Sequence, residues 1–235
     1  MSIILNKVGF HYDDQIIFEN VTYTFASKQR YAVIGPSGSG KTTLLQLLQG
    51  FITPTSGTIV KKDTRLVTVF QNNQIFPWLT TTEAIALPLK LAGVKKEERH
   101  LLVQHLLTEL DLENLKNKRP AALSGGQLQR VAIAQGLALN PQFLLLDEPT
   151  SSLDSQSKEK IQDLLLSQQQ SRQNSLLVVT HDIEEAAFLA ETILIVKEHH
   201  LLAINNPTFK NNHPNRRESL DFYQFCIALR TEVRK

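Results

Sequence analysis

The residue pattern best suited to chemistry is a glycine-rich stretch that lies between an apolar run and a helical pattern. Its glycines let consecutive backbone N–H groups turn toward one anion, and a helix that begins near Lys41 adds the partial positive charge of its N-terminus. Lys41 can reach the β- and γ-phosphates of a nucleotide, and the Thr42 hydroxyl can bind Mg²⁺. The sequence therefore predicts a phosphate-binding loop, which comprises Gly35, Pro36, Ser37, Gly38, Ser39, Gly40, Lys41, Thr42 and Thr43.

Two acids, Asp147 and Glu148, follow a second apolar run at residues 143–146. A run this apolar predicts a central parallel strand that is buried on both faces, and ligands bind beyond the C-terminal ends of such strands. There, Asp147 is placed to hold Mg²⁺, and Glu148 is placed to polarise an attacking water as a general base. Both acids could instead only cap the loop before Pro149, but the phosphate-binding loop favours the catalytic interpretation.

His181 follows a further apolar run, residues 176–180. A histidine at the end of a central strand can sense or stabilise a γ-phosphate and the water that attacks it. A single histidine is more often structural, so the sequence leaves both roles open. The next residue, Asp182, is a candidate cap for the helix that follows.

The pattern of elements predicts an α/β fold with a P-loop NTPase core, in which strands alternate with helices around a parallel sheet. Residues 3–25 alternate and predict an N-terminal antiparallel β subdomain, whereas residues 71–124 show no convincing strand and predict an inserted helical lobe. The expected buried strands are 31–34, 66–70, 143–146, 176–180 and 192–196, and the expected helices are 41–49, 95–110, 126–139, 156–169 and 183–190.

Composition limits the possible functions. The 235 residues are 42% apolar and carry a net charge of +2, which suits one large globular domain and argues against a nucleic-acid partner. The single cysteine, Cys226, excludes an internal disulfide and a multi-cysteine zinc site. No apolar run approaches the ~20 residues that span a bilayer, and no signal pattern opens the chain, so we expect a soluble protein that reaches a membrane only through a partner.

The last stretch, residues 205–235, is locally basic. A solvated surface is the ordinary interpretation of such a stretch, although an anionic membrane surface would also suit it. The cations are Lys210, Arg216, Arg217, Arg230, Arg234 and Lys235, against Glu218, Asp221 and Glu232.

A second glycine-rich helix start follows Leu123, with the sequence Ser124-Gly125-Gly126-Gln127. With it, the chain resembles the nucleotide-binding subunits of ABC transporters over nearly its whole length. Several short motifs occur in the order typical of that family. They are Tyr12, the loop 35–43, Gln71, residues 124–127, residues 144–148, residues 151–154 and His181.

The resemblance implies a role for each of these positions. Tyr12 would stack on adenine, Gln71 would act in catalysis and, with Thr42 and Asp147, in binding the metal, and His181 would be the switch histidine. The implied cofactors are ATP and Mg²⁺. Residues 1–235 would form a single ABC ATPase domain, with a helical subdomain at about 72–124 and a C-terminal helical tail at about 205–235.

The second glycine-rich helix start has no lysine and no carboxylate strand of its own. An ordinary glycine-capped helix is one explanation, but the resemblance implies that it closes over the nucleotide of another chain. Two copies would then sandwich two ATP molecules head to tail in a two-fold homodimer. The groups that would contact the partner's ATP are Ser124, Gly125, Gly126, Gln127 and Asp154.

The segment after Gln71 contains Phe76 and Trp78, the only tryptophan of the chain. If exposed, this pair suits contact with an integral membrane permease; packing in the core is the alternative. The segment resembles importers of the nitrate, sulfonate and taurine group, which includes uptake systems for thiamine-precursor pyrimidines. The resemblance thus implies a peripheral protein on the cytoplasmic face of the cell membrane, with a substrate-binding protein as an indirect partner.

Three other functions remain open at this stage. The chain could serve an ABC exporter, or it could be a soluble non-transport ABC ATPase that acts on nucleic acid or ribosomes. It could also be a P-loop kinase for a small molecule, although a kinase would not need residues 123–127.

Overall fold

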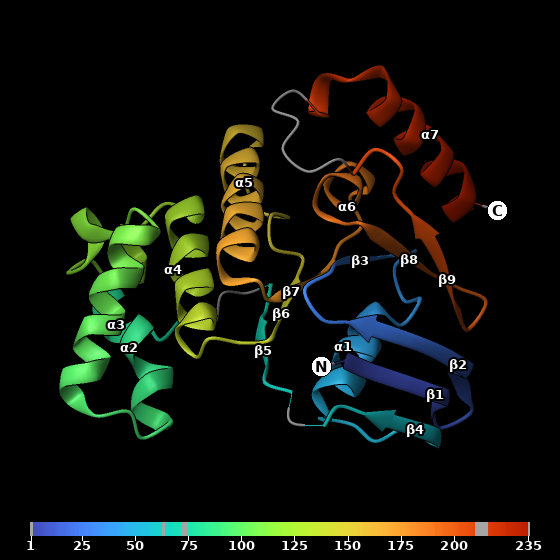
Figure 1. The fold of residues 1–235 in the computed structure, drawn as a ribbon, viewed down its shortest axis with the longest axis horizontal. Coiled ribbons are helices and arrows are strands. Elements are labelled where there is room, and N and C mark those ends of the chain that lie inside the picture. Colours follow the sequence, from blue (N-terminus) through green and yellow to red (C-terminus); the bar gives the residue numbers. More distant parts are fainter. Residues whose placement is uncertain (1, 63, 72–74, 210–215, 235) are drawn as a thin grey trace.

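The computed structural model describes residues 2–62, 64–71, 75–209 and 216–234. Lys210 and Lys235 of the basic stretch, and residues 72–74 at the start of the predicted helical lobe, lie outside the described residues. The chain forms two sheets (Figure 1). The first is antiparallel, has the order β2-β1-β4 and consists of β1 (Ser2–Tyr12), β2 (Gln15–Ala26) and β4 (Ser56–Val60).

The second sheet has six strands in the order β5-β6-β7-β3-β8-β9. Its first five strands are parallel, and β9 pairs with β8 in the antiparallel direction. The central strands are rich in Val, Ile and Leu and are buried on both faces, as expected for a parallel sheet that helices cover. The strands are β3 (Arg30–Ile34), β5 (Leu66–Val69), β6 (Phe143–Asp147), β7 (Ser175–Val179), β8 (Thr192–Lys197) and β9 (His200–Asn205).

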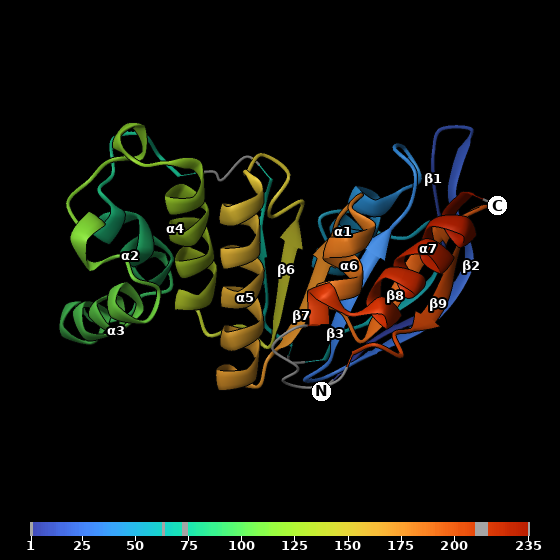
Figure 2. The ribbon, with the colours of Figure 1, turned by 90° about the horizontal axis from the view of Figure 1, so that it is seen from above.

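Each face of the parallel sheet has its own hydrophobic cluster. Helix α1 lies between the two sheets, where its leucines pack against β1, β2 and the inward residues of β3 (Figure 1). Helices α4, α5 and α6 cover the opposite face, while α2 and α3 lie at one end of the molecule and α7 at the other (Figure 2). The helices are α1 (Lys41–Gln49), α2 (Thr81–Leu91), α3 (Lys96–Glu109), α4 (Gly125–Ala138), α5 (Ser155–Arg172), α6 (Ile183–Leu189) and α7 (Leu220–Arg234).

The predicted α/β arrangement is confirmed, with the buried strands placed within one or two residues. Sequence analysis missed β4 and β9, because both are edge strands with largely exposed side chains and no apolar run. It also gave no bounds for α2, which contains Pro88 close to its C-terminal end. Helix α4 packs against α2 and α3 as well as α5, so it joins the helical lobe to the sheet. Within the described ranges, no helix has the length and apolarity needed to cross a membrane.

Gly57 in β4 occupies a backbone conformation that other residues reach only with strain. Its φ is 74°, and a Cβ atom added to it would lie 2.2 Å from the Lys7 carbonyl oxygen and 2.4 Å from the Asn6 carbonyl oxygen. Both contacts are to the backbone of β1, which pairs with β4 through Asn6 and Thr58. No rotamer change can relieve a clash between a Cβ atom and a neighbouring backbone.

We predict that Gly57→Ala destabilises the chain more than Gly93→Ala. Gly93 has a similar φ of 77° but open space around its Cβ position. Its replacement should therefore lower the free energy of unfolding only by the cost of a left-handed conformation for alanine, about 1–2 kcal/mol. At Gly57 the overpacking adds about 1–3 kcal/mol. Urea denaturation of both variants measures the difference, and equal losses would show that the β1–β4 contact does not constrain this position.

Candidate nucleotide site

The predicted phosphate-binding loop connects β3 to α1. Gly38 and Gly40 have φ values of 79° and 106°, in the left-handed region that favours glycine. A Cβ atom on Gly40 would lie 2.6 Å from Ile17 Cγ2, so the approach of β2 also requires glycine there. Gly40 is the N-cap of α1 and has no side chain with which to cap it, which leaves the N–H groups of the first turn for an anion.

The contacts of the loop's side chains indicate that the loop binds phosphate. Lys41 Nζ donates hydrogen bonds of 2.9 Å to the carbonyl oxygens of Gly35 and Pro36. Burial lowers the pKa of Lys41, while the charges of Glu148 and Asp147 oppose that shift. Ser39 Oγ is buried without a hydrogen-bond partner in the part of the chain that the structure describes. A hydroxyl without a partner and an ammonium group in one loop fit a site that completes its hydrogen bonds with phosphate oxygens.

The two predicted acids lie at the end of β6, facing the loop. Burial raises the pKa of Asp147, with a further rise from Glu148 and an opposing effect from Lys41. Glu148 has a φ of 49°, an uncommon value for a non-glycine residue. Its N–H donates a hydrogen bond of 2.8 Å to the Val179 carbonyl oxygen. Such conformations cluster at functional sites, where the surrounding structure enforces them.

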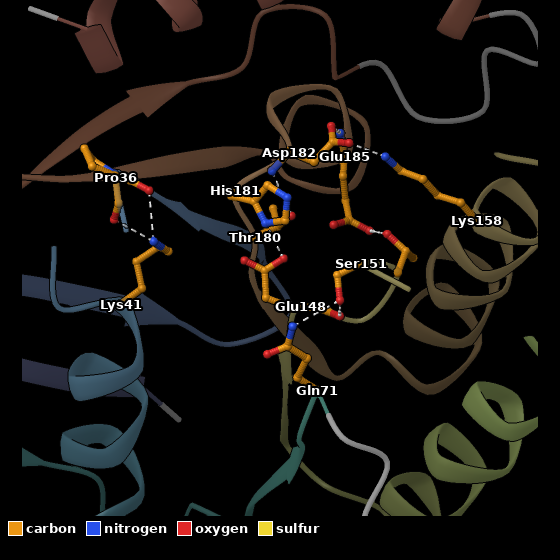
Figure 3. Close-up of polar contacts among 12 residues, drawn as sticks. Pro36, Lys41, Gln71, Glu148, Ser151, Lys158, Thr180, His181, Asp182 and Glu185 are labelled. Carbon is orange, nitrogen blue, oxygen red and sulfur yellow. Dashed lines mark hydrogen bonds and ion pairs between the residues drawn. The ribbon is translucent and has the colours of Figure 1, made fainter. Parts of the chain in front are cut away.

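The structure brings His181 and Gln71 to Glu148 (Figure 3). His181 Nδ1 lies 2.8 Å from Glu148 Oε2. Gln71 Nε2 donates to Ser151 Oγ at 3.3 Å, and Ser151 Oγ donates to the Glu148 carbonyl oxygen at 3.1 Å. The three residues that the sequence predicts as catalytic, from three different loops, thus form one connected group.

Asp182, the residue after His181, is the N-cap of α6, as expected. It accepts a hydrogen bond of 2.9 Å from the Glu185 N–H and pairs with Lys158 of α5. Burial opposes its ionisation, but the hydrogen bonds from Lys158 and Glu185 outweigh burial and lower the pKa of Asp182. At the other end of α6, Asn206 Nδ2 donates to the carbonyl oxygens of Ala187 and Ala190 at 2.7 and 2.8 Å.

Sequence analysis missed a buried carboxylate behind this site, Glu185. Its Oε1 accepts hydrogen bonds from Thr150 Oγ1 at 2.5 Å and Gln162 Nε2 at 3.4 Å. Burial raises the pKa of Glu185, and the hydrogen bond from Thr150 opposes the rise. Glu185 therefore ties the loop after Glu148 to α5 and α6. The available signal was weak: Glu185 directly precedes the apolar run Ala186–Leu189, and an acid that becomes buried there has to find a partner.

The second glycine-rich helix start is the N-terminus of α4. Ser124 caps the helix, accepting from the Gln127 N–H at 3.4 Å, while Gln127 Oε1 accepts from the Ser124 N–H at 3.0 Å. Asp154 caps α5 by accepting from the Ser157 N–H at 3.0 Å. Among the described residues, no hydrogen bond or ion pair joins residues 124–127 to the phosphate-binding loop.

Tyr12 ends β1 next to α1. Its side chain is 45% exposed, its hydroxyl donates to Gln46 Oε1 at 3.2 Å, and its ring meets Phe10 edge-on at 4.8 Å. One face of the ring is therefore supported while the side chain stays accessible, which suits a stacking surface for a base.

Phe76 and Trp78 lie on the surface between β5 and α2. Their side chains are 47% and 63% exposed, so the alternative that they pack in the core is wrong. The two rings stack on each other with centroids 4.9 Å apart. An exposed, stacked aromatic pair is a preformed anchor for a protein partner.

Comparison with known proteins identifies the family. Residues 18–151 match the model of the ABC transporter family, and the chain belongs to this family. It is an ATP-binding and ATP-hydrolysing subunit, as the sequence predicts.

The curated relatives include two import subunits. The taurine import ATP-binding protein TauB of Pseudomonas syringae pv. tomato is 38% identical, over 82% of this chain and 77% of its own length. The nitrate import ATP-binding protein NrtD of Synechocystis is 38% identical, over 93% of this chain and 88% of its own.

The solved structures show the same fold. The cassette MJ0796, in a dimeric post-hydrolysis state bound to ADP and Pi, is 33% identical, with a TM-score of 0.75 over 86% of this chain and 98% of that chain. CbiO1 of Clostridium perfringens, part of an ABC transporter complex, is 25% identical, with a TM-score of 0.82 over 97% of this chain and 98% of that chain.

We predict that Tyr12→Ala weakens ATP binding about tenfold whereas Tyr12→Phe leaves it nearly unchanged. Stacking of a base on an aromatic ring contributes about 1–3 kcal/mol, and phenylalanine keeps the ring while losing only the hydrogen bond to Gln46. Isothermal titration calorimetry with ATP measures both affinities. Equal weakening in the two variants would assign the effect to the hydroxyl rather than to stacking.

Proposed function

We propose that this chain energises substrate import through an integral membrane permease, in an uptake system of the nitrate, sulfonate or taurine type. The observation that carries the proposal is the 38% identity to both a taurine and a nitrate import subunit. The related uptake systems for thiamine-precursor pyrimidines belong to the same class. The exposed pair Phe76 and Trp78 supports a docking surface for the permease.

The polar residues at the strand ends have different roles in ATP hydrolysis. Glu148 is the general base, because its carboxylate lies at the C-terminal end of β6 beside the phosphate-binding loop. His181 orients that carboxylate through the 2.8 Å contact. Gln71 couples changes at the nucleotide site to the segment that contains Phe76. The residues 35–43 hold the phosphates, with Lys41 as the cation that neutralises them.

Thr42, Gln71 and Asp147 would hold Mg²⁺. A hydroxyl, an amide oxygen and a carboxylate are the hard oxygen ligands that this ion prefers. When bound, Mg²⁺ neutralises charge on the phosphate oxygens. The half-buried carboxylate of Asp147, whose pKa is raised by burial and by Glu148, gains a compensating positive charge in this arrangement.

The working unit is a head-to-tail homodimer of two such chains. The N-terminus of α4 is exposed at Ser124 and Gly125 and is not bonded to the chain's own phosphate-binding loop in the described ranges. Its exposed N–H groups are suited to an anion, and another copy's ATP provides one. The trans contacts are Ser124, Gly125, Gly126, Gln127 and Asp154, and the dimeric state of the MJ0796 cassette supports this arrangement.

The chain works as one domain, residues 1–235, at the cytoplasmic face of the cell membrane. Among the described residues, α2 and α3 belong to the inserted helical subdomain, which we place at about 72–124, and α7 belongs to the C-terminal helical tail, which we place at about 205–235. The permease recruits the chain to the membrane as a peripheral subunit. A substrate-binding protein acts on the permease and affects this chain only indirectly.

We predict that Glu148→Gln binds ATP with nearly normal affinity but hydrolyses it at least 100-fold more slowly, because the amide cannot accept a proton. The uncleaved nucleotide should hold two chains together, so the variant should elute as a dimer in size-exclusion chromatography with ATP. Normal hydrolysis by Glu148→Gln would exclude Glu148 as the base.

The matched control is the double variant Glu148→Gln/Ser124→Arg. Arginine at position 124 adds bulk at the exposed N-terminus of α4, without touching the phosphate-binding loop of the same chain. ATP binding should persist while the dimer is lost. A dimer that survives this change would contradict the trans role of Ser124.

For the permease we predict a second, independent result. Tagged wild-type chain should recover a multi-span membrane protein from solubilised membranes of its source, and Phe76→Ser/Trp78→Ser should not. Phe51→Ser removes another exposed aromatic side chain and should keep the partner, and all three proteins should bind ATP. Recovery of ribosomes or DNA in place of a membrane protein would refute the import proposal.

A further inference from the structure

Helix α7 lies at the end of the molecule opposite α2 and α3 (Figures 1 and 2). A cavity lies beside this helix. It has a volume of about 480 Å³ and lies between the segment after β9 and the first turns of α7. None of the residues assigned to ATP lines it. Its lining includes Thr208, Arg216, Ser219, Asp221, Gln224 and Phe225.

Arg216 is the unusual residue of this lining. It is only 7% exposed, and its guanidinium lies between the rings of Phe188 and Phe209, 4.6 and 4.5 Å from their centroids. Its Nε and Nη2 atoms are buried and have no hydrogen-bond partner in the described part of the chain. A buried charged donor without a partner is costly, and native structures normally supply one.

Two further arginines lie close to Arg216 and add to the local positive charge. Arg30 lies over Phe209 and Arg217 lies over Phe188, so three guanidinium groups surround the two rings. Arg30 pairs with Glu191 at 2.8 Å, and Arg217 pairs with Asp163 at 3.0 Å. No ion pair within the described residues includes Arg216.

The positive neighbours also act on Arg216 directly. Burial, with the charges of Arg30 and Arg217, lowers the pKa of Arg216 to about 10, so the group remains charged at neutral pH while its charge is disfavoured. Asp221 lines the same cavity but is exposed and makes no ion pair with Arg216. An anion from outside the chain would compensate the charge that these residues leave.

The rest of the lining suits a small organic molecule that carries an anionic group. Ser219 caps α7, since its Oγ accepts from the Phe222 N–H at 3.3 Å and donates to the Arg216 carbonyl oxygen at 2.9 Å. The N-terminus of α7, which favours negative charge, therefore begins beside Arg216. Phe225 provides apolar surface, while Thr208 and Gln224 provide polar groups. A volume of about 480 Å³ is far larger than the roughly 10–15 Å³ that one water needs on the same measure, so a bare inorganic ion would leave most of the cavity unfilled.

We propose that this cavity binds a small organic anion, whose carboxylate, sulfonate or phosphate group pairs with Arg216 and whose apolar part packs against Phe225. The site is separate from the ATP site and from the exposed pair Phe76 and Trp78. The proposal therefore does not depend on the transport function, and its test does not use ATP hydrolysis.

The test uses isothermal titration calorimetry on the full chain with benzoate as the probe. Wild type should bind one benzoate per chain with a Kd of about 1 mM or tighter. Benzamide, the neutral analogue of the same shape, should bind at least tenfold more weakly, and so should inorganic sulfate, which lacks the apolar body. Saturating the chain with ATP should leave benzoate binding unchanged.

Variants at Arg216 locate the site. Arg216→Met keeps an extended side chain between the two rings but removes the charge, and it should weaken benzoate binding at least tenfold. Arg217→Met removes the adjacent cation, which already has Asp163 as a partner, and should change the affinity less than threefold. If Arg216→Met does not fold, the wild type still gives a test: benzoate should raise its melting temperature and benzamide should not.

Several results would overturn the proposal. These are no benzoate binding by wild type, equal binding of benzamide, equal weakening by Arg217→Met, and competition between benzoate and ATP. Sulfate that binds as tightly as benzoate would also overturn it, because the apolar part of the cavity would then have no role.

Discussion

The parallel pairing of β7 with both β6 and β3 is the constraint on which the nucleotide site depends. In this register Val179 of β7 lies opposite Asp147 of β6 and opposite Val33 of β3. The three strands therefore end at one level, and the phosphate-binding loop, Glu148 and His181 leave the sheet side by side. A shift of any of these strands by one residue would turn its buried side chains to the other face and separate the charged groups.

The described structure also gives the charged and polar groups of the site partners within the chain. Lys41 bonds to carbonyl oxygens of its own loop, Glu148 contacts His181, and Gln71 reaches Glu148 through Ser151. These partners are exchangeable, because each group has only one or two of them and because His181 and Gln71 are exposed. The buried link from Glu185 to Thr150 is of another kind, since it fixes the loop on which Glu148 lies.

Much of this could be predicted from the sequence, because buried parallel strands and a glycine-rich loop have strong local signals. The strands that end in Ile34, Asp147 and Val179 consist of apolar runs, and the residues that we propose for the site lie at or directly after their C-terminal ends. Edge strands β4 and β9 lack such a signal, and the exposure of Trp78 depends on what packs around it. The partner of Glu185 depends on contacts between distant segments, which no local pattern contains. The same holds for Nε and Nη2 of Arg216, which find no hydrogen-bond partner among the residues that the structure describes.

The two ends of α6 have a consequence for how the site changes. Asp182 fastens the first turn to α5 through Lys158, and Asn206 fastens the last turn to the segment after β9. Held at both ends, the helix has little freedom to slide or tilt by itself. We therefore expect His181 to exchange its contact with Glu148 by rotation about its own side-chain bonds, while α6 stays in place.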